Sequence, residues 1–187
     1  MKTTFVILFS LLLLQTSGLK AQPQTPSLTV MKAELQVNGL TCSMCNLSVY
    51  KALENVSFID SIKTQLNSSV YTLILKPGEY LDPAVLRKQV EGAGFSVGKL
   101  RLFFQPVDVQ LIKNDHLSYG GFYFHVLSSP NTKENWAVEI KDKKFVSTKE
   151  FNTLQKIMGH YTCYKTGITS DCCDGIESAK VIYHLSL

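Results

Sequence analysis

The sequence lacks several features that would place it in familiar classes. Basic and acidic residues are mixed along the chain instead of forming blocks of one sign, so a role in nucleic-acid binding has little support. No Ser-His-Asp set, paired-carboxylate site or phosphate-binding loop can be argued from its residues, and we therefore predict that the protein is not an enzyme. Beyond the N-terminal segment, no apolar stretch reaches the roughly 20 residues that span a bilayer. Cysteine is scarce, with five residues in the chain, so the cysteine positions are informative.

The N-terminal segment has the pattern of a secretory signal peptide. Lys2 is followed by an apolar run over residues 5–14, and small and polar residues come next. We predict a cleaved peptide and not a membrane anchor, because the apolar run is too short to span a bilayer. Cleavage is expected after Ala21, with Gly18 as the second choice, since both are small residues at an acceptable distance from the apolar run. Cleavage would leave about 166 residues with a formal charge of +2 instead of +4, since Lys2 and Lys20 are lost. The protein is therefore expected to be exported, to the periplasm or the extracellular space, without stable membrane insertion.

Two cysteines three positions apart lie between a strand pattern and a helix pattern. Apolar and polar residues alternate over residues 33–37, which predicts a strand with one buried face. Apolar residues then recur at helical spacing, which predicts an amphipathic helix over residues 45–55. Gly39 ends the strand, so Cys42 and Cys45 lie on a loop that enters a helix N-terminus. Thiolates in this position can converge on one soft metal ion, and the positive end of the helix favours the ionised sulfur.

The same cysteine spacing also occurs in redox centres. In a thiol-disulfide oxidoreductase, Cys42 would attack and Cys45 would resolve the mixed disulfide. Thioredoxin-like centres generally carry an aromatic residue before the first cysteine and a proline or histidine between the two. Here Thr41 precedes the pair, and Ser43 and Met44 stand between. A third interpretation is an extracytoplasmic interaction module whose two cysteines are oxidised.

The residues around the pair resemble a known family. Residues 39–45 read Gly-Leu-Thr-Cys-Ser-Met-Cys, which is similar to the Gly-Met-Thr-Cys-x-x-Cys hallmark of the heavy-metal-associated domain. That domain occurs in copper chaperones, in the N-terminal parts of metal-transporting ATPases and in periplasmic mercury-binding proteins. The pattern continues through predicted strands at 59–66 and 70–75 and through a helix that ends in a family-like Ala-Gly-Phe within residues 82–95. The resemblance covers residues 32–102 and implies a ferredoxin-like βαββαβ sandwich.

The resemblance also implies a function for the cysteine pair. Cys42 and Cys45 would hold one soft ion between two thiolates, most simply Cu(I) in near-linear geometry. Hg(II) prefers the same geometry, whereas Zn²⁺ or Cd²⁺ would need further ligands. An exposed ion could be exchanged with a metal-donor or metal-acceptor protein, or could be sequestered. Leu40 replaces the family's methionine and is expected to pack under the loop, with Phe95 near the metal and Met44 pointing to solvent.

The second half of the chain carries no recognisable motif, but its patterns predict an architecture. A capping box at Ser147 and Glu150 begins a predicted helix that stops at Gly159. The order of three strands, a helix and two strands fits a small OB-like barrel, and an open five-stranded sheet with one covering helix would show the same pattern. The predicted strands are residues 103–113, 121–127, 136–140, 161–168 and 179–187.

These patterns together predict an α+β protein with four segments. The expected segments are a signal peptide at residues 1–21, a flexible mature N-terminus at 22–31, a heavy-metal-associated domain at 32–102 and a β-rich C-terminal domain of unknown function at 103–187.

Three cysteines and a histidine lie close together near the C-terminus. Cys163 could form a disulfide with Cys172 or Cys173, closing a loop of about ten residues and stabilising it by roughly 2–3 kcal/mol. Alternatively, His160 and two or three of these thiolates could form a second soft-metal site for Cu(I) or Zn²⁺. The remaining histidines are predicted to be structural. His116 is placed in a polar turn, and His125 and His184 lie within strand patterns.

Overall fold

The computed structural model describes residues 28–65, 69–105, 112–128, 137–170, 173 and 176–186 of the 187-residue chain. The predicted signal peptide lies outside the described residues, as does most of the predicted segment 22–31. No helix in the described part of the chain is both long and apolar enough to cross a membrane. The elements in chain order are β1 (Val30–Asn38), α2 (Ser43–Glu54), β2 (Ile59–Gln65), β3 (Val70–Leu75), α3 (Pro83–Gly92), β4 (Ser96–Phe104), β5 (His116–Tyr119), β6 (Phe122–Val126), β7 (Ala137–Ile140), α4 (Thr148–Met158), α5 (Thr162–Thr166) and β8 (Ile182–Ser186).

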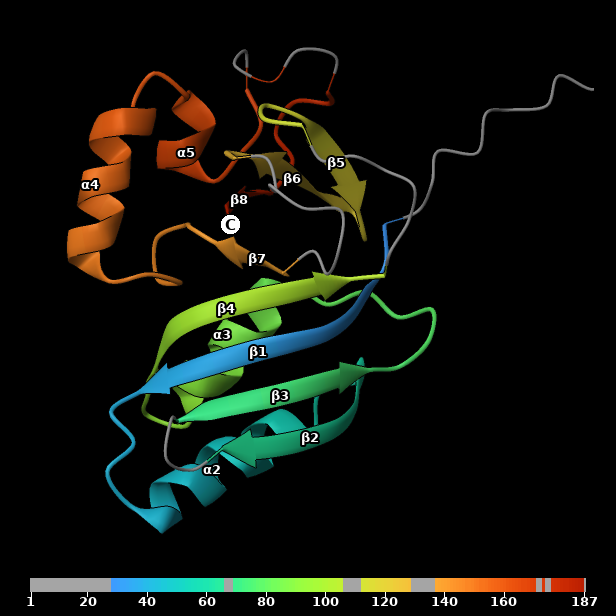
Figure 1. Ribbon diagram of the computed structural model, residues 1–187, viewed down its shortest axis with the longest axis vertical. Coiled ribbons are helices and arrows are strands. Elements are labelled where there is room, and N and C mark those ends of the chain that lie inside the picture. The colour runs from blue at the N-terminus through green and yellow to red at the C-terminus, as the bar shows by residue number, and fades with distance from the viewer. Residues whose placement is uncertain are drawn as a thin grey trace, which may run out of the picture.

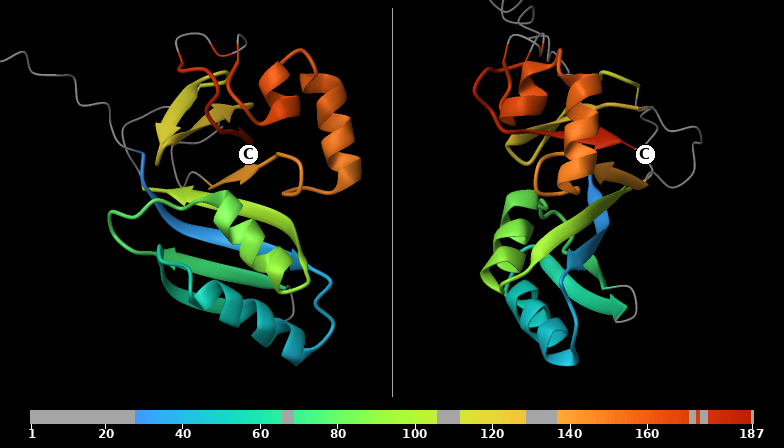
Figure 2. Two further views of the ribbon diagram at one scale, coloured as in Figure 1. Left: turned by 180° about the vertical axis from the view of Figure 1, so that it is seen from behind. Right: turned by 90° about the vertical axis from the view of Figure 1, so that its left-hand side faces the viewer.

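The strands form one sheet that runs through the whole molecule (Figure 1). Its order is β2-β3-β1-β4-β7-β8-β6-β5. The first four strands pair antiparallel in the order of a ferredoxin-like fold, with α2 and α3 as the two crossover helices. Both helices pack side by side against the same face of these strands (Figure 2). The α+β class and the βαββαβ arrangement predicted from the sequence are thereby confirmed.

Short-range patterns determine the elements of this first half. Ala33, Leu35 and Val37 of β1 are at most 2% exposed and face the helices, while the residues between them face outward. Helix α3 begins at Pro83, where the missing N–H has no cost, and the Asp82 carboxylate accepts a hydrogen bond from the Ala84 N–H at 2.8 Å. The domain boundary predicted after residue 102 stays a prediction, and β4 continues to Phe104.

Three of the strands predicted for the second half are confirmed. The predicted strands at 121–127, 136–140 and 179–187 correspond to β6, β7 and β8. The capping box is also confirmed, since the Ser147 hydroxyl accepts a hydrogen bond from the Glu150 N–H at 3.1 Å at the start of α4. These strands extend the first sheet, because β7 pairs antiparallel with β4 and β8 follows next to β7.

Other predictions for the second half are wrong. The described strands form an open sheet continuous with the first half, so the OB-like barrel is not formed, and two helices replace the one expected. Residues 161–168 were predicted as a strand but contain α5, because Tyr164 packs on Phe151 and donates a hydrogen bond to the Lys141 carbonyl at 2.7 Å. Burial of this tyrosine overrides the β propensity of its segment.

Two further corrections concern the ends of strands. The predicted strand at 103–113 is only partly present. Its first two residues belong to β4, and its last residue lies in a turn before β5. Residues 106–111 lie outside the described residues. His116 begins β5 instead of lying in the turn, because β5 and β6 form an antiparallel hairpin that pairs His116 with His125. Gly120 and Gly121 have φ values of +55° and +94° in the two-residue connection, a conformation that glycine adopts without strain.

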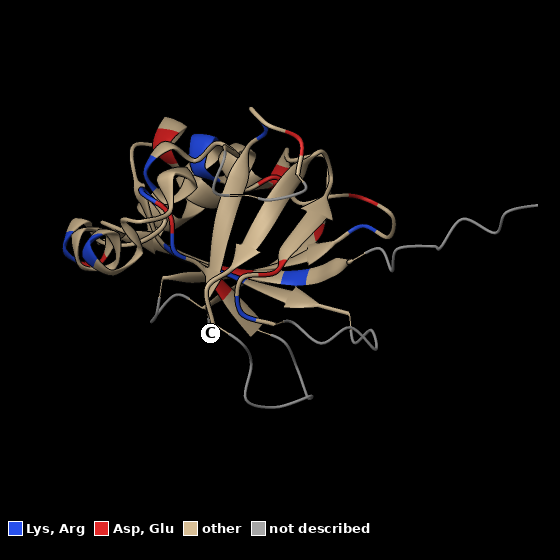
Figure 3. Cartoon of the chain, turned by 90° about the horizontal axis from the view of Figure 1, so that it is seen from above, with Lys and Arg blue, Asp and Glu red and all other residues tan. Residues whose placement is uncertain are grey.

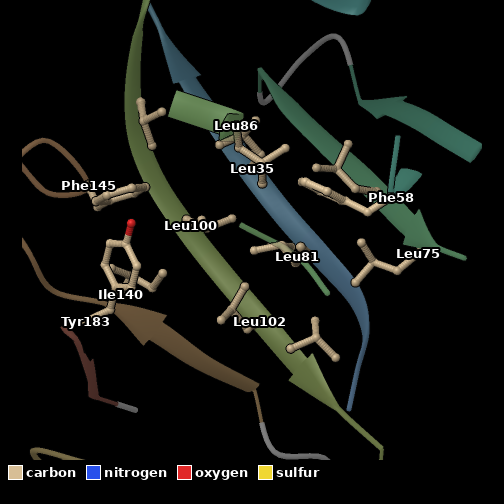
Figure 4. Close-up of a cluster of buried hydrophobic side chains, with 14 of the residues drawn as sticks. Leu35, Phe58, Leu75, Leu81, Leu86, Leu100, Leu102, Ile140, Phe145 and Tyr183 are labelled. Atoms are coloured by element: carbon tan, nitrogen blue, oxygen red, sulfur yellow. The ribbon is translucent and has the colours of Figure 1, made fainter. Parts of the chain in front are cut away.

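The main hydrophobic core lies on the α2 and α3 side of the sheet and crosses from one half to the other. Figure 4 shows Leu100 and Leu102 of β4 between the leucines of the first half and residues of the second. Ile140 of β7, Tyr183 of β8 and Phe145 belong to the same buried cluster and come from the second half of the chain. The opposite face of β6 and β8 is also buried, under α5 and residue Cys173, in a smaller cluster. The strands β6 and β8 are therefore covered on both sides.

An ion-pair network joins the two halves on the opposite face of the sheet. Glu139 of β7 is 8% exposed and accepts hydrogen bonds from Arg101 at 3.0 Å and Lys141 at 2.7 Å. Lys99 lies 2.9 Å from the same carboxylate, and Lys141 also reaches Glu150 at 2.9 Å. Basic and acidic residues accordingly lie interspersed on the ribbon in Figure 3.

Acid is expected to destabilise the protein through Glu139. Burial raises the pKa of this carboxyl, but hydrogen bonds from Lys141, Lys99 and Arg101 outweigh burial and lower the pKa from 4.5 to about 2. Because the pKa is depressed in the folded state, the unfolded state takes up the proton first as the pH falls. The stabilisation is therefore present above about pH 4.5 and is lost towards pH 2, by about 3 kcal/mol.

Urea unfolding between pH 6 and pH 2.5 measures this loss. The variant Glu139→Gln should start from a lower stability and lose about 2.5 kcal/mol less over the same interval. An equal loss in the wild type and the variant would mean that another carboxyl is responsible.

Candidate metal centre

The loop between β1 and α2 carries the first pair of cysteines. β1 ends at Asn38, and Gly39 follows with φ of +91°, in the left-handed region that favours glycine. A Cβ atom at this position would meet Phe95 Cδ1 only at 3.6 Å, so backbone conformation, and not lack of space, requires the glycine. The turn directs the chain across the end of the sheet to Cys42.

Cys42 is the N-cap of α2, and Cys45 lies in the first turn of the same helix. Cys42 has extended backbone angles, and its Sγ accepts a hydrogen bond from the Cys45 N–H at 3.2 Å. The Cys42 side chain is exposed and that of Cys45 is half-buried, and no disulfide joins them. The structure thus brings both predicted site residues together at one helix N-terminus, with their thiols at the surface.

The electrostatics of this position favour thiolate. A hydrogen bond from the Cys42 side chain is the largest cause that lowers the pKa of the Cys45 thiol below its ordinary value of 9.0. Desolvation opposes this shift, while hydrogen bonds with Thr41 and with the Cys42 backbone add to it. The first turn of α2 contains no acidic residue, so no carboxylate there offsets the positive end of the helix. A thiolate pair in this environment suits a soft cation.

A buried tyrosine supports the first turn of α2 from below. Tyr71 of β3 is 1% exposed, and its hydroxyl lies 3.1 Å from both the main-chain and side-chain oxygens of Asn46. Burial raises the pKa of the Tyr71 phenol, so it remains a donor. The Asn46 amide in turn donates to the Cys42 carbonyl at 3.3 Å. Tyr71 and Asn46 were not identified from the sequence, because a tyrosine in an alternating strand is normally a core residue.

The residues next to the cysteines lie where the sequence predicted. Met44 is 67% exposed and points away from the core. Leu40 and Phe95 are half-buried and pack against the main hydrophobic cluster beneath the loop. The centre therefore has an apolar support on one side and solvent on the other, which leaves the two thiols accessible to another molecule.

The predictions for the C-terminal cysteines are only partly testable. Cys163 and Cys173 lie in one buried cluster, but no disulfide joins them. Cys172, the other predicted partner, lies outside the described residues. Within the described residues, Cys163 is grouped with two other histidines and not with His160, which follows α4 on an exposed turn with its ring 3.9 Å from that of Tyr161.

Comparisons with known proteins found a family match in the first half of the chain. Residues 34–96 match the model of the heavy-metal-associated domain, and the matched segment contains both Cys42 and Cys45. No curated protein matches the chain.

Several solved structures are similar to the same part of the chain. A copper-binding domain from HMA7, a P-type ATPase, is 27% identical, with a TM-score of 0.33, and the match covers 36% of this chain and 89% of that one. The yeast copper transporter domain Ccc2a is 18% identical, with a TM-score of 0.32 and coverage of 36% and 90%. The N-terminal domain of the zinc(II) ATPase ZiaA is 16% identical, with a TM-score of 0.32 and coverage of 37% and 96%.

Proposed function

We propose that the heavy-metal-associated domain at residues 34–96 carries one Cu(I) ion between Cys42 and Cys45, for transfer to another protein or for sequestration, outside the cytoplasm. The observation that carries this proposal is the position of the pair. Cys42 caps α2 with an exposed thiol, and Cys45 follows one turn later with a lowered pKa. The export part of the proposal rests on the N-terminal sequence pattern alone.

The ligand set favours Cu(I) over harder ions. Two thiolates satisfy a near-linear Cu(I) ion, whereas Zn²⁺ needs four ligands in a tetrahedron. The first turn of α2 offers no carboxylate as a further ligand. Cys45 and Cys42 therefore match a cation of low coordination number, a property that Hg(II) shares.

Ligand exchange is the mechanism that this geometry allows. Because Cys42 is exposed, a thiolate of an acceptor protein can approach the bound ion and form a three-coordinate intermediate. Release of Cys42 or Cys45 from that intermediate then passes the ion on. Tyr71 and Asn46 hold the first turn in place, so the cysteine pair stays arranged for the next ion. No covalent bond of a substrate would be made or broken, so the protein would act as a carrier.

The redox alternative is less well supported by the residues around the pair. A disulfide oxidoreductase would use Cys42 as the attacking thiol. Thr41 stands where thioredoxin-like centres generally carry an aromatic residue, and Ser43 and Met44 stand where they carry a proline or histidine.

A Cu(I) titration combined with alkylation tests the proposal. The reduced protein is titrated with Cu(I) against a chromophoric chelator, and its thiols are then alkylated and assigned by mass spectrometry. We expect one tight equivalent, with Cys42 and Cys45 modified rapidly before the addition of Cu(I) and protected after it. Addition of Zn²⁺ in place of Cu(I) should protect them less. Absence of tight binding, or protection of other cysteines only, would contradict the proposal.

A further inference from the structure

A second group of metal-ligating side chains lies in the other half of the molecule. His125 on β6, His184 on β8 and Cys163 on α5 are each 0% exposed. One ligand atom from each residue, either ring nitrogen of a histidine or the cysteine Sγ, lies within 4.8 Å of the others. We propose that these three residues form a buried site for a resident Zn²⁺ ion, independent of the cysteine pair on α2.

The sheet pairing explains how residues so far apart in sequence converge. β6 and β8 are parallel neighbours, and their register places His125 directly opposite His184. Both histidines point to the face opposite the main core. Helix α5 covers this face, and its Cys163 packs against Ile182 of β8. The site therefore depends on three separate elements that only the folded chain brings together.

The histidine nitrogens lack the partners that buried polar atoms normally have. Within the described residues, neither ring nitrogen of His125 has a hydrogen-bond partner, and neither does Nε2 of His184. Leaving such groups buried and unsatisfied costs free energy, and more than nine in ten buried polar atoms avoid it. A metal ion bound through one nitrogen of each ring would satisfy two of these three atoms at once.

A carboxylate orients one of the two rings. Asp142 Oδ1 lies 2.7 Å from the ring nitrogen Nδ1 of His184. Asp142 Oδ2 accepts a hydrogen bond from the backbone N–H of His184 at 2.6 Å. When Nδ1–H donates to the carboxylate, Nε2 carries the lone pair and is available as a ligand. Histidine ligands of zinc usually have such a carboxylate or carbonyl behind them, which fixes the ring and strengthens the ligand.

The charges and dimensions of the group fit a divalent ion. The Cys163 thiolate and the Asp142 carboxylate together would neutralise Zn²⁺, so the complex adds no net charge to the interior. Ligand atoms around tetrahedral zinc are about 3.4–3.7 Å apart, so the side chains need to move by roughly 1 Å at most, and a water molecule would take the fourth position of the tetrahedron.

The surroundings indicate a retained ion and not a transferred one. The Tyr161 ring packs edge-on against His125 and the Tyr164 ring against His184, each with ring centres 4.9 Å apart. This aromatic cover gives a partner thiolate no access, in contrast to the exposed Cys42. The ion would connect α5 to β6 and β8, and its expected role is to stabilise the C-terminal half.

The test uses the full protein with Cys42 and Cys45 both replaced by serine, so that the first site cannot bind. The reduced variant is titrated with Zn²⁺ against a chelator, and Co²⁺ is used as a spectroscopic substitute for Zn²⁺. We expect one equivalent of each ion, a thiolate-to-Co²⁺ charge-transfer band, and a higher melting temperature with Zn²⁺. Adding Cys163→Ser should weaken Zn²⁺ binding at least about 100-fold and remove the charge-transfer band.

Two further variants keep the test decisive if Cys163→Ser does not fold. Asp142→Asn should retain the cysteine and both histidines and weaken binding about 10- to 100-fold, because it alters only the group behind His184. His160→Gln is the matched control, since this histidine is exposed nearby but lies outside the group, and it should leave binding unchanged.

Three results would overturn the proposal. They are the absence of Zn²⁺ binding in the Cys42/Cys45 double variant, equal binding after Cys163→Ser or Asp142→Asn, and a disulfide at Cys163 in the unreduced protein. Each result is distinct from failure of the Cu(I) proposal, because Cys163→Ser alone should still bind Cu(I) at Cys42 and Cys45.

Discussion

Replacing Cys42 and Cys45 together with serine is expected to weaken Cu(I) binding by at least about 10,000-fold, or roughly 5.5 kcal/mol. The reason is the chemistry of the ligand atom. A serine hydroxyl is neutral at pH 7 and hard, whereas Cu(I) is soft and selects thiolates. Cys42 is exposed, and the first turn of α2 contains no acidic residue. No carboxylate there could therefore replace the lost thiolates as a ligand.

The same double substitution should leave the fold intact. Serine is among the best N-cap residues, so Ser at position 42 can accept the N–H hydrogen bond that the Cys42 sulfur now accepts. We expect the free energy of unfolding to change by less than about 1 kcal/mol. Chelator competition measures the affinity, and urea unfolding measures the stability. Tight binding of one Cu(I) in the folded double variant would show that the site has been placed wrongly.

Truncation of Leu102 to alanine is expected to lower the free energy of unfolding by about 3–4 kcal/mol. Leu102 is fully buried and pairs with Ala33 of β1 on one side and with Val138 of β7 on the other. Alanine would leave a cavity at the place where the two halves of the core meet (Figure 4). The effect should therefore appear in both halves of the molecule.

Urea unfolding followed by fluorescence and circular dichroism measures this effect. Leu47→Ala is the matched control, because Leu47 is 41% exposed on α2 and the same change there should cost less than about 1 kcal/mol. If Leu102→Ala cost no more than Leu47→Ala, the continuous core would not contribute to stability as the packing indicates.

The first half could be predicted from sequence because its signals are local. Alternation in β1, helical spacing in α2 and the Asp82-Pro83 start of α3 all lie within a few residues. One face of each element is solvated, so the apolar pattern shows which side is buried. The positions of Cys42 and Cys45 follow from these boundaries, whereas their role as ligands stays a prediction.

The second half was predicted less completely, because two of its strands, β6 and β8, are buried on both faces. In β6, residues 124–126 are all buried, so no alternation marks the strand's two sides. The Gly120-Gly121 pair was an available signal for the hairpin that was not used. Helix α5 spans five residues and depends on the contacts of Tyr164, which no local pattern indicates.

The C-terminal histidine and cysteine group was also hidden from sequence analysis. His125 and His184 lie in separate strands, and only their parallel pairing brings them together. The sequence showed His160 close to Cys163 along the chain, whereas the histidines grouped with this thiol in the structure are His125 and His184. Which histidine meets the thiol is decided by strand register and the placement of α5.

The pairing of β7 with β4 has a consequence for self-association. An unpaired border strand offers its N–H and C=O groups to strands of other molecules and is a common start of aggregation. Here three residue pairs with β7 cover part of the border that β4 would otherwise expose. Of the described strands, β2 and β5 then form the two borders, and β2 carries exposed charges at Asp60 and Lys63. The protein is thereby protected on this side from adding a foreign strand along β4.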